Sequence, residues 1–493
     1  MSQQELAAIK AAAIDGRAQP IFYRLSQLQK LRDTLVEQAN QIQDAIKSDS
    51  GITSAEAKIE YSLAVETVRT RYTELADFEK VLEQEYSVAK GKDDPSRRHG
   101  VGTALIKPSS HSLFYSTIAP LAAAIAAGNV VIIQFENSTR TLPNLLKSLL
   151  KPALDHDSIT FTSTTPQLDT PHVIVSQSTD NTTSHPANHI VSPFNAVSIA
   201  LVDRNADFDA AATSLINARF SHRGRSPHAP DLVLVNEFAK KPLLQALVRA
   251  TIASADSAPT ANGTSKSSSA SSDLKPLLST LEKSSARIIV QESTGAVLDL
   301  PTRSPSLLSQ KITQPALLVH SVRSLDDAID FLTQDGRTYL SAAYFSDLGS
   351  GKYLSQFVPS QASFLNGIPE EVLVGPAFPL SFPASGDAVD RFTVEMFSAA
   401  RPAFVAGKAK GKGLEGAGLT ATTNERNKKV QELYKRAVEA LPVQKRRKQL
   451  AAGFGFFEQA FILHFGFAVL TTLVSVGSAG WWLKSGRGWR PWR

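Results

Sequence analysis

A short turn rich in histidine and arginine, SHRGRSPH at 221–228, comes directly before the apolar run DLVLV at 231–235. Loops beside buried strands often carry binding and catalytic residues. Ser226 could serve as a nucleophile with His222 or His228 as its base. A serine followed by proline is, however, usually an ordinary loop residue, so this arrangement is a weak indication of catalysis.

Two arginines of the same turn allow a second kind of chemistry. Arg223 and Arg225 could line a tunnel and bind an anionic group such as a fatty carboxylate or a phosphate, because guanidinium groups bind such anions bidentately. They could equally face solvent or pair with nearby carboxylates such as Asp231. The sequence leaves both interpretations open.

Composition restricts the chemistry further. The 493 residues include no cysteine, which excludes disulfides, thiolate metal sites and a cysteine nucleophile. We expect no metal site. With 42% hydrophobic and 20% charged residues, the chain has the composition of a folded protein of two or three domains.

The spacing of apolar residues predicts the helices and strands that position this turn. Apolar residues recur at threes and fours over 21–46 and over 59–78, which predicts two amphipathic helices, the first running towards 48–51. A Ser/Ala-rich stretch at 253–273 predicts a flexible surface insertion. Short β-branched runs alternate with helical stretches and predict an α/β fold with largely parallel sheets; they lie at 130–133, 172–175, 197–202, 231–235, 287–290 and 316–320.

The C-terminal region predicts a membrane anchor. Residues 459–483 contain no Asp, Glu, Lys or Arg and are long enough as a helix to cross a bilayer. Trp481 and Trp482 stand at its edge, where indole rings favour the interface. A buried core helix is the alternative. Because basic residues, including KRRK at 445–448, flank this run, we interpret the net charge of +6 as a membrane signature rather than a nucleic-acid one.

A tail anchor also predicts a location. No secretory signal is visible at the N-terminus. Because so few residues follow the expected anchor, the bulk of the chain is expected on the cytosolic side. We expect the membrane to be that of the endoplasmic reticulum, with the peroxisomal and outer mitochondrial membranes as alternatives.

Five stretches resemble the aldehyde dehydrogenase superfamily in order and approximate spacing, most closely its class 3 or fatty aldehyde branch. They are QPIFYRLSQLQKLRDTLVEQANQIQDAIKSD, IAPLAAAIAAGNVVI, DFDAAATSLINARF, HAPDLVLVNE and VRSLDDAIDFL. Some members of that branch also carry a C-terminal anchor. The resemblance covers about residues 17–405. It implies an N-terminal helical pair and two Rossmann-like parallel-sheet domains, followed by the transmembrane helix. The expected parts are 1–195 (helices and former NAD-binding domain), 196–385 (former catalytic domain), 386–450 (return segment and basic helical linker) and 459–483 (anchor).

The resemblance also implies which residues should perform catalysis. Family members use a cysteine thiolate as nucleophile, a glutamate base and an asparagine that stabilises the oxyanion. In this sequence Pro227 stands at the cysteine position, Pro193 at or next to the glutamate position and His111 at the asparagine position. The catalytic set is therefore expected to be degenerate.

The cofactor positions have changed as well. Gln134 replaces the lysine that binds the adenosine ribose, and Lys311 and Thr313 replace the glutamate and phenylalanine of the motif that positions the nicotinamide ribose. No glycine occurs between Gly128 and Gly224, although backbone approach to a pyrophosphate requires glycine. We therefore expect no bound NAD.

Together with the expected anchor, the changed catalytic and cofactor positions predict a membrane-tethered protein that no longer oxidises aldehydes. One role is a scaffold or regulatory subunit, paired as a homodimer or with an active paralogue. A second is a binding module for an acyl or other anionic ligand. The alternative is a diverged membrane-bound oxidoreductase that oxidises long-chain aldehydes with NAD or NADP. A fold alone does not decide between them, and no nucleic-acid partner is expected.

Overall fold

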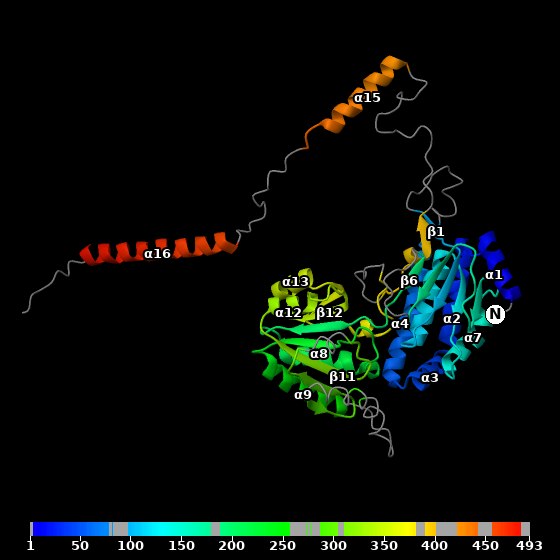
Figure 1. The fold of residues 1–493 in the computed structure, drawn as a ribbon, viewed down its shortest axis with the longest axis horizontal. Helices are drawn as coiled ribbons and strands as arrows, with labels where there is room; N and C mark the ends of the chain where they lie inside the picture. Colours follow the sequence, from blue (N-terminus) through cyan, green and yellow to red (C-terminus); the bar gives the residue numbers. More distant parts are fainter. Residues whose placement is uncertain are drawn as a thin grey trace, which may run out of the picture. The chain divides into compact units, whose positions relative to one another are not determined.

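The computed structural model describes residues 3–77, 97–178, 188–256, 286–303, 310–380, 390–400, 422–441 and 456–484, together with Val81, Leu274 and Leu277. Contacts divide the chain into two units, Met1–Phe404 and Val405–Arg493. Figure 1 shows the helices and strands of both units. The expected boundaries near residues 195 and 385 stay predictions.

The N-terminal helices pack around a parallel sheet. A capping box between Thr53 and Glu56 begins α4, and Gly51 ends α3 with a positive φ of 67°. The helix α6 is buried on almost every side, as its nearly continuous apolar sequence predicts. The helices of this part are α1 (Gln3–Asp15), α2 (Ile21–Glu37), α3 (Ala39–Ser50), α4 (Ser54–Leu75), α6 (Leu113–Ala127) and α7 (Thr141–Ala153).

The first sheet has five parallel strands in the order β4-β3-β2-β5-β6. One face packs against α2, α3, α4, α6 and α7, and α1 covers the other. The chain runs outward from β2 to β4 and then returns to the opposite side of β2, so the topological switch point lies between β2 and β5. The strands are β2 (Thr103–Lys107), β3 (Val130–Gln134), β4 (Ile159–Thr162), β5 (His172–Ser176) and β6 (His189–Val191).

The second sheet has seven strands in the order β13-β12-β7-β8-β11-β10-β9, of which only β9 pairs antiparallel. The helices α8 and α9 contribute to the core on one face, and α12 and α13 to the core on the other. Its strands are β7 (Ser198–Val202), β8 (Leu232–Asn236), β9 (Arg287–Gln291), β10 (Ala296–Leu300), β11 (Ala316–Val322), β12 (Tyr339–Phe345) and β13 (Ser360–Leu365). Its helices are α8 (Phe208–Phe220), α9 (Lys240–Asp256), α12 (Leu325–Thr333), α13 (Leu348–Phe357) and the short α14 (Glu370–Leu373).

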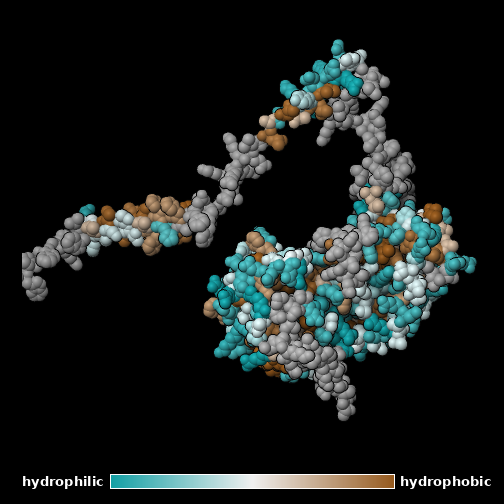
Figure 2. Space-filling view, in the orientation of Figure 1, coloured by the Kyte–Doolittle hydropathy of each residue, from teal (hydrophilic) through white to brown (hydrophobic). Residues whose placement is uncertain are grey.

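Smaller elements complete the fold. The strands β1 (Arg98–Gly100) and β14 (Ser398–Ala400) form an antiparallel pair. Single 3-10 turns form η1 (Ser221–Gly224) and η2 (Val394–Phe397). The second unit contains α15 (Thr423–Val438) and α16 (Phe456–Lys484). Within α16, Phe461–Trp481 is long and apolar enough to cross a membrane, and none of this span is buried (Figure 2).

Two predicted boundaries were wrong. The first long helix breaks at Gln38, which caps both α2 and α3 in a non-helical conformation, and a further helix, α1, precedes it. The predicted flexible insertion at 253–273 begins too early, because α9 continues to Asp256; the rest of it lies outside the described residues. All six predicted strands are present.

Candidate functional site

The turn that carries the candidate residues is held in an unusual backbone conformation. His222 and Arg223 both have positive φ, 51° and 57°, which non-glycine residues rarely adopt. The backbone N–H of His222 donates to Oε1 of Glu56 on α4, at 2.7 Å. At Gly224, also at positive φ, a Cβ atom would lie 2.4 Å from the backbone of Gln314. Glu56 on one side and the backbone of Gln314 on the other therefore fix the backbone of the turn.

A buried ion cluster lies directly after the turn. Asp231 is 2% exposed, and its carboxylate accepts from Nη1 of Arg219 at 3.2 Å and from Nζ of Lys311 at 2.8 Å. The backbone N–H groups of Ser198 and Ile312 donate to the same carboxylate at 2.8 and 3.0 Å. All of these donors converge on one anion, as a buried charge requires.

The cluster joins two positions that the family resemblance identified. Lys311 also donates to the backbone carbonyl of Pro227 at 2.6 Å. The expected nucleophile position and the expected ribose-binding position are thus connected by a hydrogen bond, with the Lys311 side chain 6% exposed. Burial lowers the pKa of Lys311, while Asp231 opposes this shift.

The three histidines in or near the turn are buried and are weak bases. Burial lowers the pKa of His111 to about 3, with His222 adding repulsion. Burial likewise lowers the pKa of His222, and that of His228, beside Arg391 and Lys311, well below its usual range. These side chains are therefore neutral at physiological pH and add no positive charge to the turn.

An aromatic and cationic stack fills the space beside His228. The rings of His228 and Phe378 meet edge to face with centroids 4.5 Å apart, and the Arg391 guanidinium lies 4.1 Å from the Phe378 centroid. Arg391 also donates to the carbonyl of Val372 at 2.7 Å. Burial lowers the pKa of Arg391 to about 10, so it stays charged. The side chains of His228, Phe378 and Arg391 therefore fill the interior beside the turn.

The side chains of the turn that the sequence proposed for chemistry lie in different environments. Arg225 is exposed and Arg223 is partly buried, and the carboxylate of Asp231 pairs with Arg219 and Lys311. Ser226 is fully buried, and its Oγ accepts from the backbone N–H of His228. The proposed nucleophilic use of Ser226 would need that oxygen to be accessible.

The other expected catalytic positions are also enclosed. His111 lies just before α6 and is 8% exposed, with Nε2 3.1 Å from the carbonyl oxygen of Leu373. The rings of His111 and His222 meet edge to face at 5.7 Å. Pro193 is buried in the loop between β6 and β7. The assignments of these positions to family roles stay predictions.

A polar hollow of about 530 Å³ lies at the carboxyl ends of the first sheet. It includes Lys107 at the end of β2, Gln134 at the end of β3 and Ser176 at the end of β5, which surround the switch point where parallel sheets commonly bind nucleotides. Arg140 also lines it and donates to the carbonyl of Ser110 at 3.1 Å. No glycine is among the residues that line this hollow.

The expected ribose-binding residues are committed to other contacts. Thr165 donates to Oε1 of Gln134 at 3.0 Å and accepts from Nζ of Lys107 at 3.1 Å. Thr313 donates its backbone N–H to Gln314 at 3.2 Å. A cofactor in this hollow would therefore meet no lysine at the Gln134 position. Lys311, which is not among the residues that line the hollow, offers no carboxylate to a ribose.

A second hollow, of about 560 Å³, lies beside α8 and includes Ser214, Asn217, Glu370 and Leu373. The residues that line it and those that line the polar hollow do not overlap. The two hollows are thus separate among the described residues.

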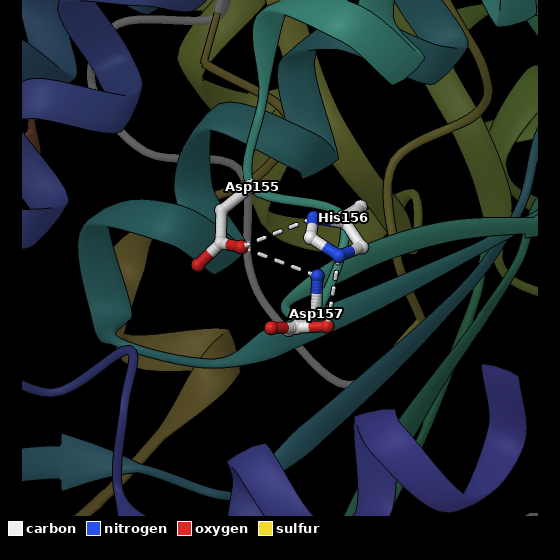
Figure 3. Close-up of side chains that lie close together, drawn as sticks. All are labelled: Asp155, His156 and Asp157. Carbon is white, nitrogen blue, oxygen red and sulfur yellow. Dashed lines mark hydrogen bonds and ion pairs between the residues drawn. The ribbon is translucent and has the colours of Figure 1, made fainter. Parts of the chain in front are cut away.

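Asp155, His156 and Asp157 form a cluster of potential metal ligands (Figure 3). Arg17 contacts both carboxylates, at 2.8 Å to Asp155 and 3.1 Å to Asp157, and Tyr23 donates to Asp155 at 2.7 Å. Arg17 offsets one of the two negative charges, and its contacts and that of Tyr23 already occupy oxygens of both carboxylates. The cluster therefore gives no reason to assign a metal, and the absence of a metal site stays a prediction.

Glu60 is a buried carboxyl that the sequence analysis missed. Its Oε1 accepts from the backbone N–H groups of Phe114 and Tyr115 at 3.0 and 3.3 Å and so caps the first turn of α6. Burial raises the pKa of Glu60 to about 7, partly offset by these two bonds. Its position within a helical stripe gave no sign that it points inward.

Glu60→Gln is expected to flatten the dependence of stability on pH. Because the folded pKa, about 7, exceeds the unfolded value of about 4.5, protonated Glu60 favours the fold at low pH, and this contribution is lost as pH rises through 7. The loss should reach on the order of 3 kcal/mol at 1.36 kcal/mol per pKa unit. Glutamine does not titrate, and its carbonyl can accept both bonds.

Thermal unfolding measured between pH 5 and pH 8.5 checks this expectation. The wild-type melting temperature should fall relative to that of Glu60→Gln as pH rises. Glu66→Gln, on an exposed position of the same helix, should track the wild type. Parallel curves for wild type and Glu60→Gln would contradict the assignment.

Comparison with known proteins supports a family assignment. Residues 3–154 match the model of the aldehyde dehydrogenase family. The 4,4'-diaponeurosporen-aldehyde dehydrogenase of Staphylococcus aureus is 25% identical over 250 residues, which cover 46% of this chain and 53% of that protein. Mouse aldehyde dehydrogenase family 3 member B1 is 23% identical over 353 residues, covering 67% and 75%. These matches support assignment of the chain to the aldehyde dehydrogenase superfamily, with a class 3-like resemblance. This confirms the resemblance drawn from the sequence.

Solved structures agree on the fold. The substrate-bound state of Staphylococcus aureus AldH superposes with a TM-score of 0.66 at 18% identity, covering 88% of this chain and all of that one. An aldehyde dehydrogenase C mutant of Pseudomonas syringae, in complex with NAD+ and octanal, gives 0.61 at 15% identity, covering 81% and 89%. The aldehyde dehydrogenase fold is therefore confirmed. The chain spans about half the length of two curated relatives, the Staphylococcus protein and the dimeric NADP-preferring enzyme of dog.

Proposed function

We propose that this aldehyde dehydrogenase-like protein has lost NAD-dependent aldehyde oxidation and acts as a membrane-tethered scaffold or regulatory subunit. The single observation that carries the proposal is the hydrogen bond from Lys311 to the carbonyl of Pro227. A proline offers neither a nucleophile nor a backbone N–H for an oxyanion. A lysine that is bound to Asp231 cannot replace a carboxylate that accepts from a ribose.

The anchor supports the membrane part of the proposal. The span Phe461–Trp481 could cross a bilayer, and we place the remainder of the chain on the cytosolic side. The endoplasmic reticulum is the proposed membrane. As partner we propose a second copy of the chain or an active paralogue, because β13 and β9 form the two edges of the seven-stranded sheet and carry exposed apolar residues, Leu365 and Ile288.

A ligand-binding role is the second candidate. The polar hollow at the switch point carries Lys107 and Arg140, and cations at such a place favour an acyl carboxylate or another anion. We propose that NAD does not occupy it, since its lining offers no glycine for the pyrophosphate.

An assay of NADH formation tests the loss of activity. We expect the full chain in nanodiscs to give no NADH above the protein-free rate with NAD and a long-chain aldehyde, because among the described residues the candidate nucleophile Ser226 and the candidate bases His222 and His228 are buried. An active class 3 enzyme under the same conditions is the control. Saturable turnover that disappears in Ser226→Ala would contradict the proposal and favour the diverged oxidoreductase.

A further inference from the structure

The helix α15 presents an apolar stripe without a partner. Val430, Leu433, Tyr434 and Val438 recur at three and four residues and lie on one side of the helix. They are 48%, 41%, 64% and 58% exposed, and no side chain of α15 is buried within the described part of the chain. Figure 2 shows hydrophobic residues on one side of α15 and hydrophilic residues on the other. Such a helix needs a surface to cover its stripe.

The charges around the stripe indicate the kind of surface. With 3.6 residues per turn, Lys429 and Arg436 flank the stripe on one side and Lys435 on the other. Glu425 and Glu432 lie on the opposite side of the helix. Cations at the border of an apolar stripe and acids on the far side are typical of helices that lie in the interface of an anionic membrane.

The sequence places α15 close to the candidate span. Twenty-two residues separate Val438 from Phe461, so the fully extended connection reaches about 80 Å at most. Four consecutive basic residues, 445–448, lie in this connection and favour anionic headgroups. Once the span is inserted, α15 therefore meets the same membrane at high effective concentration.

We propose that α15 binds the surface of the membrane in which α16 is anchored, with its apolar stripe at the boundary of headgroups and acyl chains and its basic residues on anionic lipids. The inference rests on the proposed anchoring and extends it. The anchor then has two parts, a span and an interfacial helix, and the interfacial part depends on lipid charge. The helix thereby limits how far the folded unit can move from the bilayer.

A single labelled cysteine tests this inference, because the chain contains no native cysteine. The full chain carrying Leu433→Cys, modified with an environment-sensitive fluorophore, is placed in nanodiscs of phosphatidylcholine with or without phosphatidylserine. Glu432→Cys, on the opposite side of the same helix, is the matched control. We expect a blue-shifted emission and several-fold weaker iodide quenching for the label at 433 only, and only with phosphatidylserine.

A charge variant provides a second readout. Lys429→Glu combined with Arg436→Glu should restore quenching of the label at 433 in the anionic nanodiscs. Equal quenching at 433 and 432 in anionic nanodiscs would overturn the inference while leaving the anchor intact. Equal protection at 433 in both lipids would also overturn it and point to a protein that covers the stripe. Failure of the full chain to float with vesicles would remove the anchor and this inference together.

Discussion

Asp231→Asn is expected to lower the free energy of unfolding by about 3–5 kcal/mol, because removing one partner of a buried ion pair leaves an uncompensated charge. In this chain two buried cations, Arg219 and Lys311, depend on the same carboxylate. The asparagine would also direct its NH2 group, which is a hydrogen-bond donor, at one of these two cations. Since whole domains are stable by only about 5–15 kcal/mol, the variant should unfold at much lower denaturant or fail to accumulate.

Three further variants isolate the cause of this loss of stability. Lys311→Met should cost less, because Asp231 keeps Arg219 and two backbone donors. Combining it with Asp231→Asn should recover part of the loss, as expected for residues that interact directly. Asp335→Asn breaks an exposed pair with Arg337 and should change stability by less than about 1 kcal/mol. Equal denaturant midpoints for Asp231→Asn and wild type would contradict the structural role of the cluster.

The sequence predicted the sheet cores well because their strands are short β-branched runs. The strand β12, with the sequence YLSAAYF, escaped notice because small residues interrupt its apolar pattern, although every residue in it is buried. The break at Gln38 was missed because the apolar spacing continues through it. Periodicity reports which side faces the core and does not report where one helix ends and the next begins.

The site could be predicted only in part. Sequence reasoning identified Pro227 and Lys311 as changed positions but gave no reason to place them in contact, since they lie 84 positions apart in the sequence. Arg219 and Arg391 were missed altogether. Arg219 lies in DFDAAATSLINARF, a stretch that indicated the family but gave no role to its arginine, and no motif marked the segment around Arg391. A buried arginine looks like an exposed one until its partners are known. The available signals for the cluster were the family-like stretch HAPDLVLVNE, which contains Asp231, and the changed position Lys311.

The loss of NAD binding is the second large expected effect, and it follows from two features of the polar hollow and one of the buried ion cluster. No glycine is among the described residues that line the hollow, and Gln134 is bonded to Thr165. In the ion cluster, Lys311 is bound to Asp231. A pyrophosphate needs close backbone approach, which glycine permits. Two ribose contacts and the phosphate turn are therefore changed together, so no single substitution should restore affinity.

Titration of NAD by calorimetry tests the central claim most directly. The full chain in nanodiscs receives NAD at concentrations that saturate an active class 3 enzyme, which serves as the positive control. We predict no heat above dilution from folded protein, with its thermal unfolding temperature unchanged by NAD. Binding in the micromolar range, with a matching rise in that temperature, would contradict the account and restore the diverged dehydrogenase as the better description.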